Sequence, residues 1–498
     1  DPLGPGNALI LAGGPMAATR TSTGSRLSVG CKSPLTKGIK EANAGGMAGD
    51  SLGALGYRAL VFRGALPADR PSIFILDENG GRLEDGAPYW GLGTEAATAA
   101  LMKKYGNDYC VVCIGQAGEQ QLTAAGIAVT DKEGNPFRLA ARGGVGAVMG
   151  SKGLKAVLLR SPSKAGLEIS KDERKPIIAF NKHVASSDRP KVMRDYGTAS
   201  TVMPVQVMGG LPVRNFSRGQ IDGAEQIGGD HMVELIKQRG GVGEAVHACM
   251  TGCVIQCSNA FAGEDGELLC APVEFETIGL CGSNLEIANL DGIARINRVC
   301  NDLGLDTIEV GAALGVMMEA AEMDTPLPAE YKRSDFPRFG DADRAVEVLS
   351  SLANGDPLGV LLGRGVVATG KALGVKRIPA VKNQAMSAYD PRAVKGTAVT
   401  YATSPQGADH TAGLTVFFPV DHRDPSLAVE HSRNAQIQRA AYDAVALCAF
   451  NTSATGMRPD LVIDMLRGVF GVELPENWMD VIGRQGIDLE LAYNRAAG

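Results

Sequence analysis

Three cysteines at equal spacing constrain this chain more than any other feature of its sequence. Cys249, Cys253 and Cys257 form a C-x3-C-x3-C pattern, and a fourth cysteine, Cys448, ends the distant segment 443–448. Iron–sulfur clusters are held by four thiolates, so three from one turn and one from elsewhere favour a cluster. Two other interpretations stay open. The triplet could be the buried stripe of a helix, because free cysteine packs as a small apolar residue, or it could bind a structural zinc.

Composition and charge exclude several classes of protein. The 498 residues are enough for two or three domains with substantial cores. The formal net charge is −6 and no Lys/Arg block stands out, which argues against nucleic acid as a partner. No run of about 18 apolar residues is present, so we expect no membrane span. Ten cysteines without secretory features indicate a reducing compartment, and we expect a cytoplasmic protein.

The secondary-structure pattern changes near residue 165. Before it, short apolar runs at 59–62, 73–76 and 156–159 lie between glycine-rich turns and predict strands. After it, apolar positions three and four apart predict helices at 171–186, 230–237, 290–299, 307–323, 427–447 and 457–469, with a hairpin at 259–270. We therefore expect an α+β fold in which an N-terminal β-rich domain (1–162) is followed by two mainly helical domains (163–375 and 376–498). The second holds the cysteine triplet and the third holds the distant cysteine.

Two short motifs have ordinary structural interpretations beside the functional ones. Glu244-x-x-His247 would place a carboxylate and an imidazole on one helical face, where they bind a metal or form a solvated helix end. Cys110 and Cys113 form a CxxC within an apolar, strand-like run. That setting favours buried core over redox or metal chemistry.

Three further side chains are candidates for acid–base chemistry. His410 ends a polar loop that contains a glycine, where a histidine is usually solvated and catalysis is the alternative. Glu274 and Glu276 follow the cysteine triplet. On a strand, alternate residues face opposite sides, so at most one of the two carboxylates is expected to point into a site.

Taken together, the motifs resemble the tungsten-containing aldehyde:ferredoxin oxidoreductases over essentially the whole chain. The segments that carry this resemblance are 1–7, 32–36, 45–46, 114–119, 146–152, the cysteine triplet, 274–277, 301–306, 407–410 and 443–448. Members of that family extend beyond this chain at both ends, so the resemblance implies that the chain is a fragment.

The resemblance implies a set of cofactors and ligands. A tungsten (or molybdenum) ion is expected in the dithiolene sulfurs of two pyranopterins, covered by the β-rich domain, with a 4Fe–4S cluster beside it and a Mg²⁺ bridging the pterin phosphates. Cys249, Cys253, Cys257 and Cys448 match the cluster ligands. The residues expected to bind the pterin cofactor are Arg26, Asn43, Gly45, Arg142, Gly143, Asn301, Asp306 and Asp443. Asn301 stands where the family usually has an aspartate.

The implied activity is oxidation of a small aldehyde to a carboxylic acid. Electrons would leave through the cluster to ferredoxin or a partner subunit, and the chain could form a homo-oligomer. Glu274 matches the general base, and His410 matches the residue that positions the carbonyl or relays protons. Two rivals stay open: a reductive family branch that sends low-potential electrons into a substrate such as an aromatic thioester, and a non-catalytic iron–sulfur electron carrier.

Overall fold

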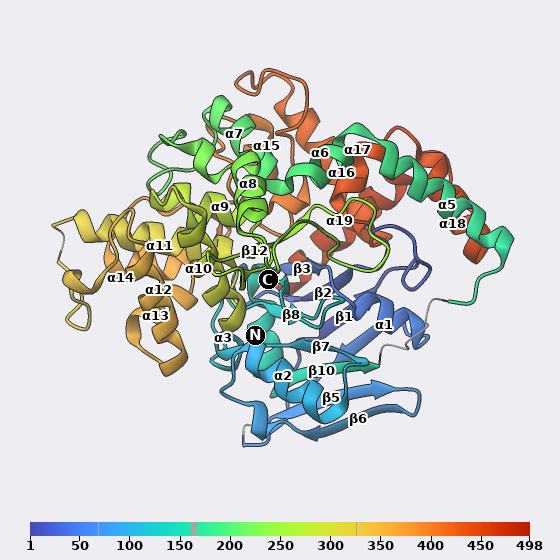
Figure 1. Cartoon of the computed structure of the whole chain (residues 1–498), viewed down its shortest axis with the longest axis horizontal. Coiled ribbons are helices and arrows are strands. Elements are labelled where there is room, and N and C mark those ends of the chain that lie inside the picture. Colours follow the sequence, from blue (N-terminus) through green and yellow to red (C-terminus); the bar gives the residue numbers. More distant parts are fainter. Residues whose placement is uncertain (68, 161–166, 325) are drawn as a thin grey trace.

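Strands dominate the first 160 residues, where apolar runs alternate with glycine-rich turns (Figure 1). The computed structural model describes residues 1–67, 69–160, 167–324 and 326–498. The strands of this part are β1 (Leu9–Gly13), β2 (Leu27–Lys32), β3 (Ile39–Ala44), β4 (Ala59–Phe62), β5 (Ser72–Asp77), β6 (Gly80–Asp85), β7 (Tyr109–Cys113), β8 (Ile127–Val129), β9 (Arg138–Ala140) and β10 (Leu154–Arg160). The three strands predicted from apolar runs are confirmed.

These strands form two sheets. The smaller has the order β3-β2-β1-β4 and is antiparallel throughout. The larger has the order β6-β5-β10-β7-β8-β9, in which only the β5–β10 pair is parallel. One apolar core is shared by both sheets and includes Leu11, Val29 and Val157. Cys110 and Cys113 are buried in β7, as the apolar run predicts.

Short helices connect and cover these strands, and longer helices make up most of the remaining chain. The helices are α1 (Ala48–Ala54), α2 (Thr94–Tyr105), α3 (Gln116–Glu119), α4 (Val145–Ser151), α5 (Lys171–Ser186), α6 (Asp188–Tyr196), α7 (Val202–Met208), α8 (Gly229–Arg239), α9 (Phe275–Cys281), α10 (Leu290–Leu303), α11 (Thr307–Glu322), α12 (Ala342–Ser350), α13 (Pro357–Gly363), α14 (Val366–Leu373), α15 (Lys395–Thr403), α16 (Ala428–Ala444), α17 (Thr452–Thr455), α18 (Pro459–Phe470) and α19 (Trp478–Ala497). The short strands among them are β11 (Glu244–His247), β12 (Ser258–Ala262), β13 (Leu268–Cys270), β14 (Ala380–Val381) and β15 (Gln384–Ala385). The α+β fold is confirmed, as are the predicted helices and the β12–β13 hairpin.

The helix α10 illustrates how the sequence sets these boundaries. The side chain of Asn289 accepts a hydrogen bond from the backbone N–H of Gly292 and so caps the first turn. Ile293 and Ile296, three residues apart, are both fully buried. Gly304 ends the helix in the left-handed conformation, with φ of 73°, which glycine adopts without strain.

Local patterns mislead at three places near the cysteine triplet. Glu244 and His247 lie on β11, not on a helix, because this segment pairs with β12. Glu274 precedes α9 and Glu276 lies in its first turn, so the expected strand alternation is wrong. The backbone N–H of Phe275 donates to the hydroxyl of Thr198, and a partner so far away in the sequence is not visible in a local pattern.

The segment 248–257 forms turns between β11 and β12, so the helical cysteine stripe is also wrong. Gly252 and Gln256 both have positive φ angles, 75° and 52°, which a helix does not contain. The segment is held from several sides: the backbone N–H of Gly46 donates to the carbonyl of Cys249 (2.8 Å), and that of Val254 to the hydroxyl of Ser22 (3.1 Å).

Two apolar cores support the helical part. The larger joins α10 and α11 to α9 and α12–α14. The other brings α5, the cysteine turns and α16–α18 together, and Figure 1 shows α5 beside α18. The predicted boundary at 162–163 lies outside the described residues, and the three-domain division stays a prediction.

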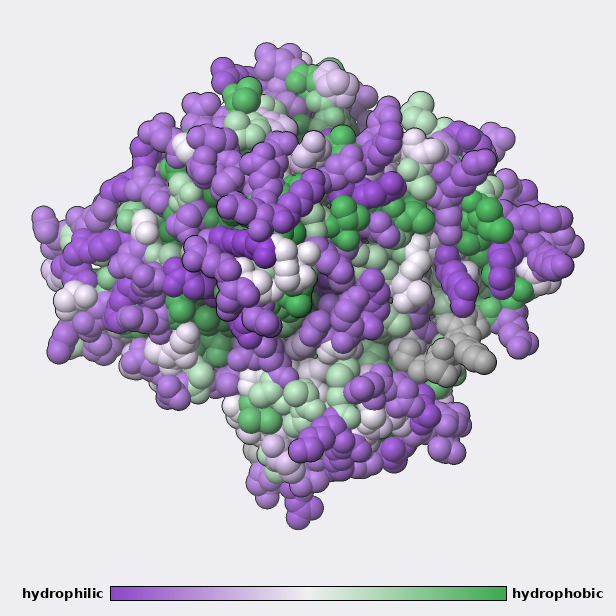
Figure 2. Space-filling model, in the orientation of Figure 1, coloured by the Kyte–Doolittle hydropathy of each residue, from purple (hydrophilic) through white to green (hydrophobic). Residues whose placement is uncertain are grey.

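None of the helices in the described residues is long and apolar enough to cross a membrane. The face of the molecule in Figure 2 is mostly hydrophilic, with hydrophobic residues in small separate areas.

Candidate cofactor and proton-transfer site

The four predicted cluster cysteines share one neighbourhood. A hydrogen bond from the thiol of Cys253 lowers the pKa of Cys249, and nearby guanidinium groups add to this effect. Burial raises the pKa of Cys257, and the charges of Cys249 and Cys448 raise it further. Burial also raises the pKa of Cys448, where Cys249 acts in the same direction. None of these thiols forms a disulfide, so all four are free to bind a metal.

The strand β3 and the turn after it approach the same thiols. A Cβ atom on Gly45 would lie 3.2 Å from the Sγ of Cys249, so any larger residue would press on this sulfur. Arg26 donates to both the side chain and the carbonyl of Asn43. Burial alone would lower the pKa of Arg26, but the charges of Cys448 and Cys249 raise it. A guanidinium and an asparagine thus lie beside the sulfurs.

Arg138 on β9 is a site residue that sequence reasoning missed. Its Nη1 donates to the hydroxyl of Ser258 (2.5 Å), while Nε and Nη2 are buried without a hydrogen-bond partner in the described part of the chain. Its charge lowers the pKa of both Cys249 and Glu274, so it lies near the thiols and that carboxylate. Two buried donors without acceptors are costly and indicate a ligand position. No motif in the sequence singles this arginine out.

Glu274 faces the thiols. Its Oε2 accepts a hydrogen bond from the hydroxyl of Thr198, and no partner is found for Oε1 among the described residues. Burial raises the pKa of Glu274, Thr198 and Arg138 lower it, and the charge of Cys249 raises it. The carboxylate is therefore held by one oxygen and has the other available.

His410 is paired with Glu276, not with Glu274. It lies in a short 3₁₀ turn, with Nε2 3.8 Å from the Oε1 of Glu276 and Nδ1 3.2 Å from the hydroxyl of Ser387. The Oε2 of Glu276 accepts from the backbone N–H of Ala388 (2.8 Å), whereas Oε1 is buried and receives no hydrogen bond from the described residues. Burial raises the pKa of Glu276, and His410 opposes this shift. Sequence reasoning named Glu276 but assigned it no role.

Arg142 lies close to His410 and is fully engaged with protein acceptors. It donates to the carbonyls of Ala385 (2.6 Å) and Ala408 (2.7 Å) and to the hydroxyl of Ser387, and its Nε is 3.3 Å from the Oδ2 of Asp306. Through these hydrogen bonds, Arg142 connects the start of α11 to the loop before His410.

The remaining predicted cofactor residues lie around these groups. Gly143 has φ of 80°, and a Cβ there would meet the buried side chain of Lys40 at 2.4 Å. Asn301 directs its amide at the sulfur of Cys270 (3.6 Å). Asp306 caps α11. Burial raises the pKa of Asp443 to about 7, although Arg439 acts against it.

We call the two groups of residues the thiol region and the His410 region. The thiol region comprises Cys249, Cys253, Cys257, Cys448, Arg26, Arg138 and Glu274. The His410 region comprises His410, Glu276, Ser387, Arg142, Asp306, Glu309 and Asp409. They meet at the start of α9, where Glu274 and Glu276 are two residues apart.

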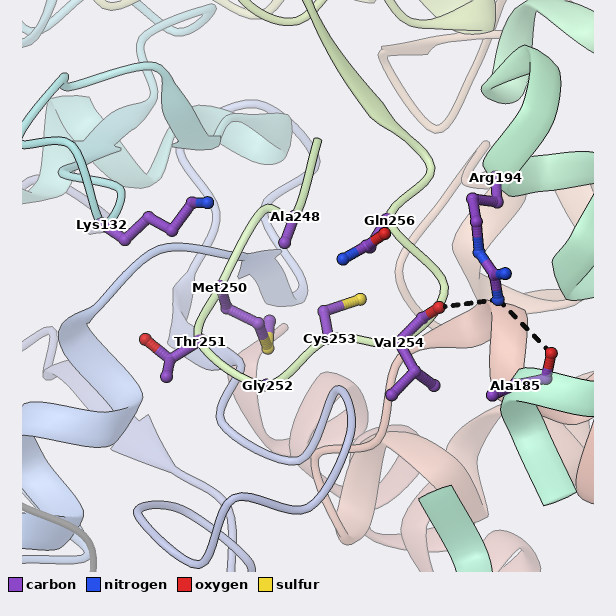
Figure 3. A pocket seen from close by; sticks show the side chains of 10 residues that line it. All are labelled: Lys132, Ala185, Arg194, Ala248, Met250, Thr251, Gly252, Cys253, Val254 and Gln256. Carbon is purple, nitrogen blue, oxygen red and sulfur yellow. Dashed lines mark hydrogen bonds between the residues drawn. The ribbon is translucent and has the colours of Figure 1, made fainter. Parts of the chain in front are cut away.

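A surface cavity of about 490 Å³ lies on the outer side of the cysteine turns (Figure 3). Cys253 is among its lining residues, with Lys132 and Arg194 at its sides. Arg194 donates to the carbonyls of Val254 (3.1 Å) and Ala185 (3.3 Å) and so fixes this wall. The thiol region is thus close to solvent on one side.

Comparison with known protein families identifies the family to which this chain belongs. The model of the aldehyde ferredoxin oxidoreductase N-terminal domain matches residues 1–161, and the model of domains 2 and 3 matches residues 177–498. The chain belongs to the aldehyde ferredoxin oxidoreductase family. It is therefore an oxidoreductase, and the resemblance found in its motifs is confirmed.

Individual relatives agree with this family assignment. The tungsten-containing aldehyde ferredoxin oxidoreductases of Pyrococcus furiosus and Thermococcus kodakarensis are each 30% identical over all of this chain and 81% of their own lengths. The WOR-like subunit of an aliphatic sulfonate oxidoreductase from Pyrococcus furiosus is 24% identical over 98% of this chain and 77% of its own length. Among solved structures, the BamBC active-site complex of benzoyl coenzyme A reductase has the same fold, with a TM-score of 0.77 at 19% identity over all of this chain and 82% of the other.

The residues present fit the cofactors of such an oxidoreductase. Four free thiols in one neighbourhood match the donor set of a 4Fe–4S cluster. The two unpartnered nitrogens of Arg138 match an acidic or carbonyl-bearing ligand such as a pterin with its phosphate.

Proposed function

We propose that this chain oxidises aldehydes to carboxylic acids at a tungsten (or molybdenum) bis-pyranopterin centre and that the electrons leave through a 4Fe–4S cluster to ferredoxin or a partner subunit. The observation that carries the proposal is the convergence in the thiol region of four free thiols, a guanidinium with two nitrogens unpartnered among the described residues, and a carboxylate bonded through one oxygen. The names of the relatives at 30% identity support the aldehyde and the tungsten.

Each cofactor has residues to hold it. Cys249, Cys253, Cys257 and Cys448 would ligate the cluster, and Arg26 and Arg138 would bind the pterin cofactor. When bound, the metal–pterin group supplies two-electron redox chemistry and the cluster supplies one-electron transfer. The protein contributes placement and proton handling.

Glu274 is the proposed general base. Thr198 holds its Oε2, which leaves Oε1 to accept a proton from water or substrate. Burial raises its pKa, and a base whose pKa lies nearer to the operating pH both accepts and releases protons efficiently.

His410 is the proposed positioning and relay residue. Ser387 orients its Nδ1, and Nε2 faces the unpartnered Oε1 of Glu276. A proton that arrives at the imidazole can therefore be passed to a buried carboxylate that has a vacant lone pair.

Elemental analysis combined with an aldehyde-dependent dye assay tests this proposal. The purified protein should contain tungsten or molybdenum, about four irons per chain, and should reduce a viologen dye with simple aldehydes. Iron without tungsten or molybdenum would instead indicate an electron carrier. Full metal content without aldehyde oxidation would indicate the reductive branch.

A further inference from the structure

A histidine ring nitrogen near the cysteine turns lacks a partner. His247 ends β11, and its side chain is 6% exposed. Its Nδ1 lies 2.8 Å from the Oε2 of Glu244, which fixes the ring orientation. The other nitrogen, Nε2, is buried and has no hydrogen bond to any residue that the structure describes. A buried imidazole nitrogen without a partner is costly, so something is expected to bind it.

Two carboxylates face this nitrogen from the turn that follows β8. The Oε2 of Glu133 is 3.5 Å from Nε2 of His247, too long for a good hydrogen bond. Asp131 is buried, and its Oδ1 accepts from the backbone N–H groups of Glu133 (3.1 Å) and Asn135 (2.9 Å), which leaves Oδ2 available. One ligand atom from each of Asp131, Glu133 and His247 lies within 4.8 Å of the others.

Two cations lie near this group and do not occupy it. Lys132 pairs with the other oxygen of Glu133, Oε1, at 3.1 Å. Arg138 lowers the pKa of Asp131 through its charge, but burial outweighs this effect and raises that pKa. The space between the imidazole and the two carboxylates therefore lacks a charge-balancing partner from the described residues.

We propose that Asp131, Glu133 and His247 bind one divalent transition-metal ion, with Glu244 orienting the imidazole from behind. A histidine that donates its second nitrogen to a carboxylate while the first binds metal is the usual arrangement in metalloproteins. One imidazole with two carboxylates suits Zn²⁺ and its neighbours in the first transition row, whereas Mg²⁺ and Ca²⁺ prefer oxygen ligands alone. The proposal does not depend on the aldehyde chemistry.

The geometry needs only a small movement to close around an ion. Metal–ligand distances of about 2.1 Å put the ligand atoms of a tetrahedral site about 3.4 Å apart. Glu133 is exposed, so its side chain can approach while Asp131 and His247 keep their places. Because His247 is two residues before Cys249, a bound ion would join the turn after β8 to the start of the cysteine turns.

Zinc binding by the anaerobically purified holoenzyme tests the site. The protein is dialysed against EDTA and then against graded Zn²⁺, and zinc and iron per chain are measured together. We expect one zinc per chain in the parent, and zinc affinity at least about tenfold weaker in Glu133→Gln and His247→Gln. Glu244→Gln should weaken zinc binding by about 10–100-fold, the range seen when a residue that supports a ligand is replaced.

Matched controls separate this site from general zinc binding. His231→Gln and Glu264→Gln replace a histidine and an exposed carboxylate elsewhere and should leave zinc binding unchanged. If His247→Gln also loses iron, Glu133→Gln decides the question because that side chain is exposed and outside the thiol region. Equal zinc affinity in Glu133→Gln and the parent, or no zinc in the parent, would overturn the proposal. An anomalous peak at the zinc edge between the three side chains would support it.

Discussion

The thiol region and the His410 region differ in how the protein satisfies the guanidinium groups of their arginines. In the His410 region, Arg142 donates to two carbonyls and a hydroxyl, and Asp409 is paired with the buried Lys40. In the thiol region, two buried nitrogens of Arg138 have no acceptor among the described residues, and only Oε2 of Glu274 is engaged, by Thr198. Unsatisfied buried groups are expensive unless a ligand completes them.

This difference suggests that the residues of the two regions have different roles. The thiol region carries groups that a cofactor would satisfy, so its residues should control cofactor retention and the chemical step. In the His410 region the guanidinium is satisfied within the protein, and Oε1 of Glu276 is left without a hydrogen bond among the described residues, so its residues should control positioning and proton movement.

Cys448→Ser should have the largest effect. A serine hydroxyl is a poor cluster ligand compared with a thiolate, so we expect loss or conversion of the cluster and no measurable turnover. Iron content per chain and the visible absorption of the cluster provide the measurement.

Cys110→Ser is the matched control for this change. Cys110 is buried, like Cys448, but lies in β7, with its sulfur 3.4 Å from the hydroxyl of Thr130. Iron content should be unaffected. Loss of iron from Cys110→Ser with retention in Cys448→Ser would show that the ligand assignment is wrong.

Glu274→Gln should retain tungsten and iron while losing most of its turnover. Glutamine keeps the size of the side chain and the hydrogen bond with Thr198 but removes the basic oxygen. General-base catalysis is typically worth about 10²–10⁴-fold, or roughly 3–5 kcal/mol of barrier. The measurement is kcat at full metal content. A kcat within a few-fold of the parent would mean that Glu274 only bonds its neighbours.

Glu309 gives the His410 region a pH-dependent stability. Burial raises its pKa to about 7, although the backbone N–H groups of Ala385 and Val366 donate to its carboxylate. In the unfolded chain its pKa is about 4.3. Between these values the folded protein retains a proton that the unfolded chain has released, so the free energy of unfolding decreases as the pH rises from about 4 to 7. The full effect is on the order of 3 kcal/mol.

Glu309→Gln should remove this decrease in the free energy of unfolding with rising pH. The variant loses one carboxylate acceptor at every pH, so at pH 5 its free energy of unfolding should be lower than that of the parent. Because only the parent loses stability as the pH rises, the gap between the two proteins should narrow by pH 8. Calorimetric unfolding midpoints across this range measure the gap. Glu319→Gln, on the same helix with a partly exposed side chain, is the control. A gap that stays constant with pH would contradict the assignment.

The sequence alone predicts the features that depend on residues close together in the chain. The triplet spacing, the strand that holds Cys110 and the periodic helices are set by neighbouring residues, and the structure agrees with the strands and helices. The sequence alone does not predict features that depend on residues far apart in the chain. Thr198 bonds Glu274 across 76 residues, and Ser387 orients His410 from another loop. Nothing in the sequence distinguishes Arg138 from the other arginines. Only the fold shows that two of its nitrogens are buried without a partner among the described residues.

Glu276→Gln is the smallest and most discriminating change. The Oε2 of Glu276 bonds the backbone of Ala388 and should continue to do so as an amide oxygen, so folding and metal content should be preserved. The amide would replace Oε1, which faces His410 at 3.8 Å, and it cannot take a proton from the imidazole. We expect kcat to fall about tenfold, or about 1.4 kcal/mol of barrier, with a shift in the pH profile of kcat. In His410→Asn, which also loses the aromatic ring, the loss should approach that of Glu274→Gln. A Glu276→Gln loss as large as that of Glu274→Gln would contradict the different roles of the two regions, because the base would then belong to the His410 region.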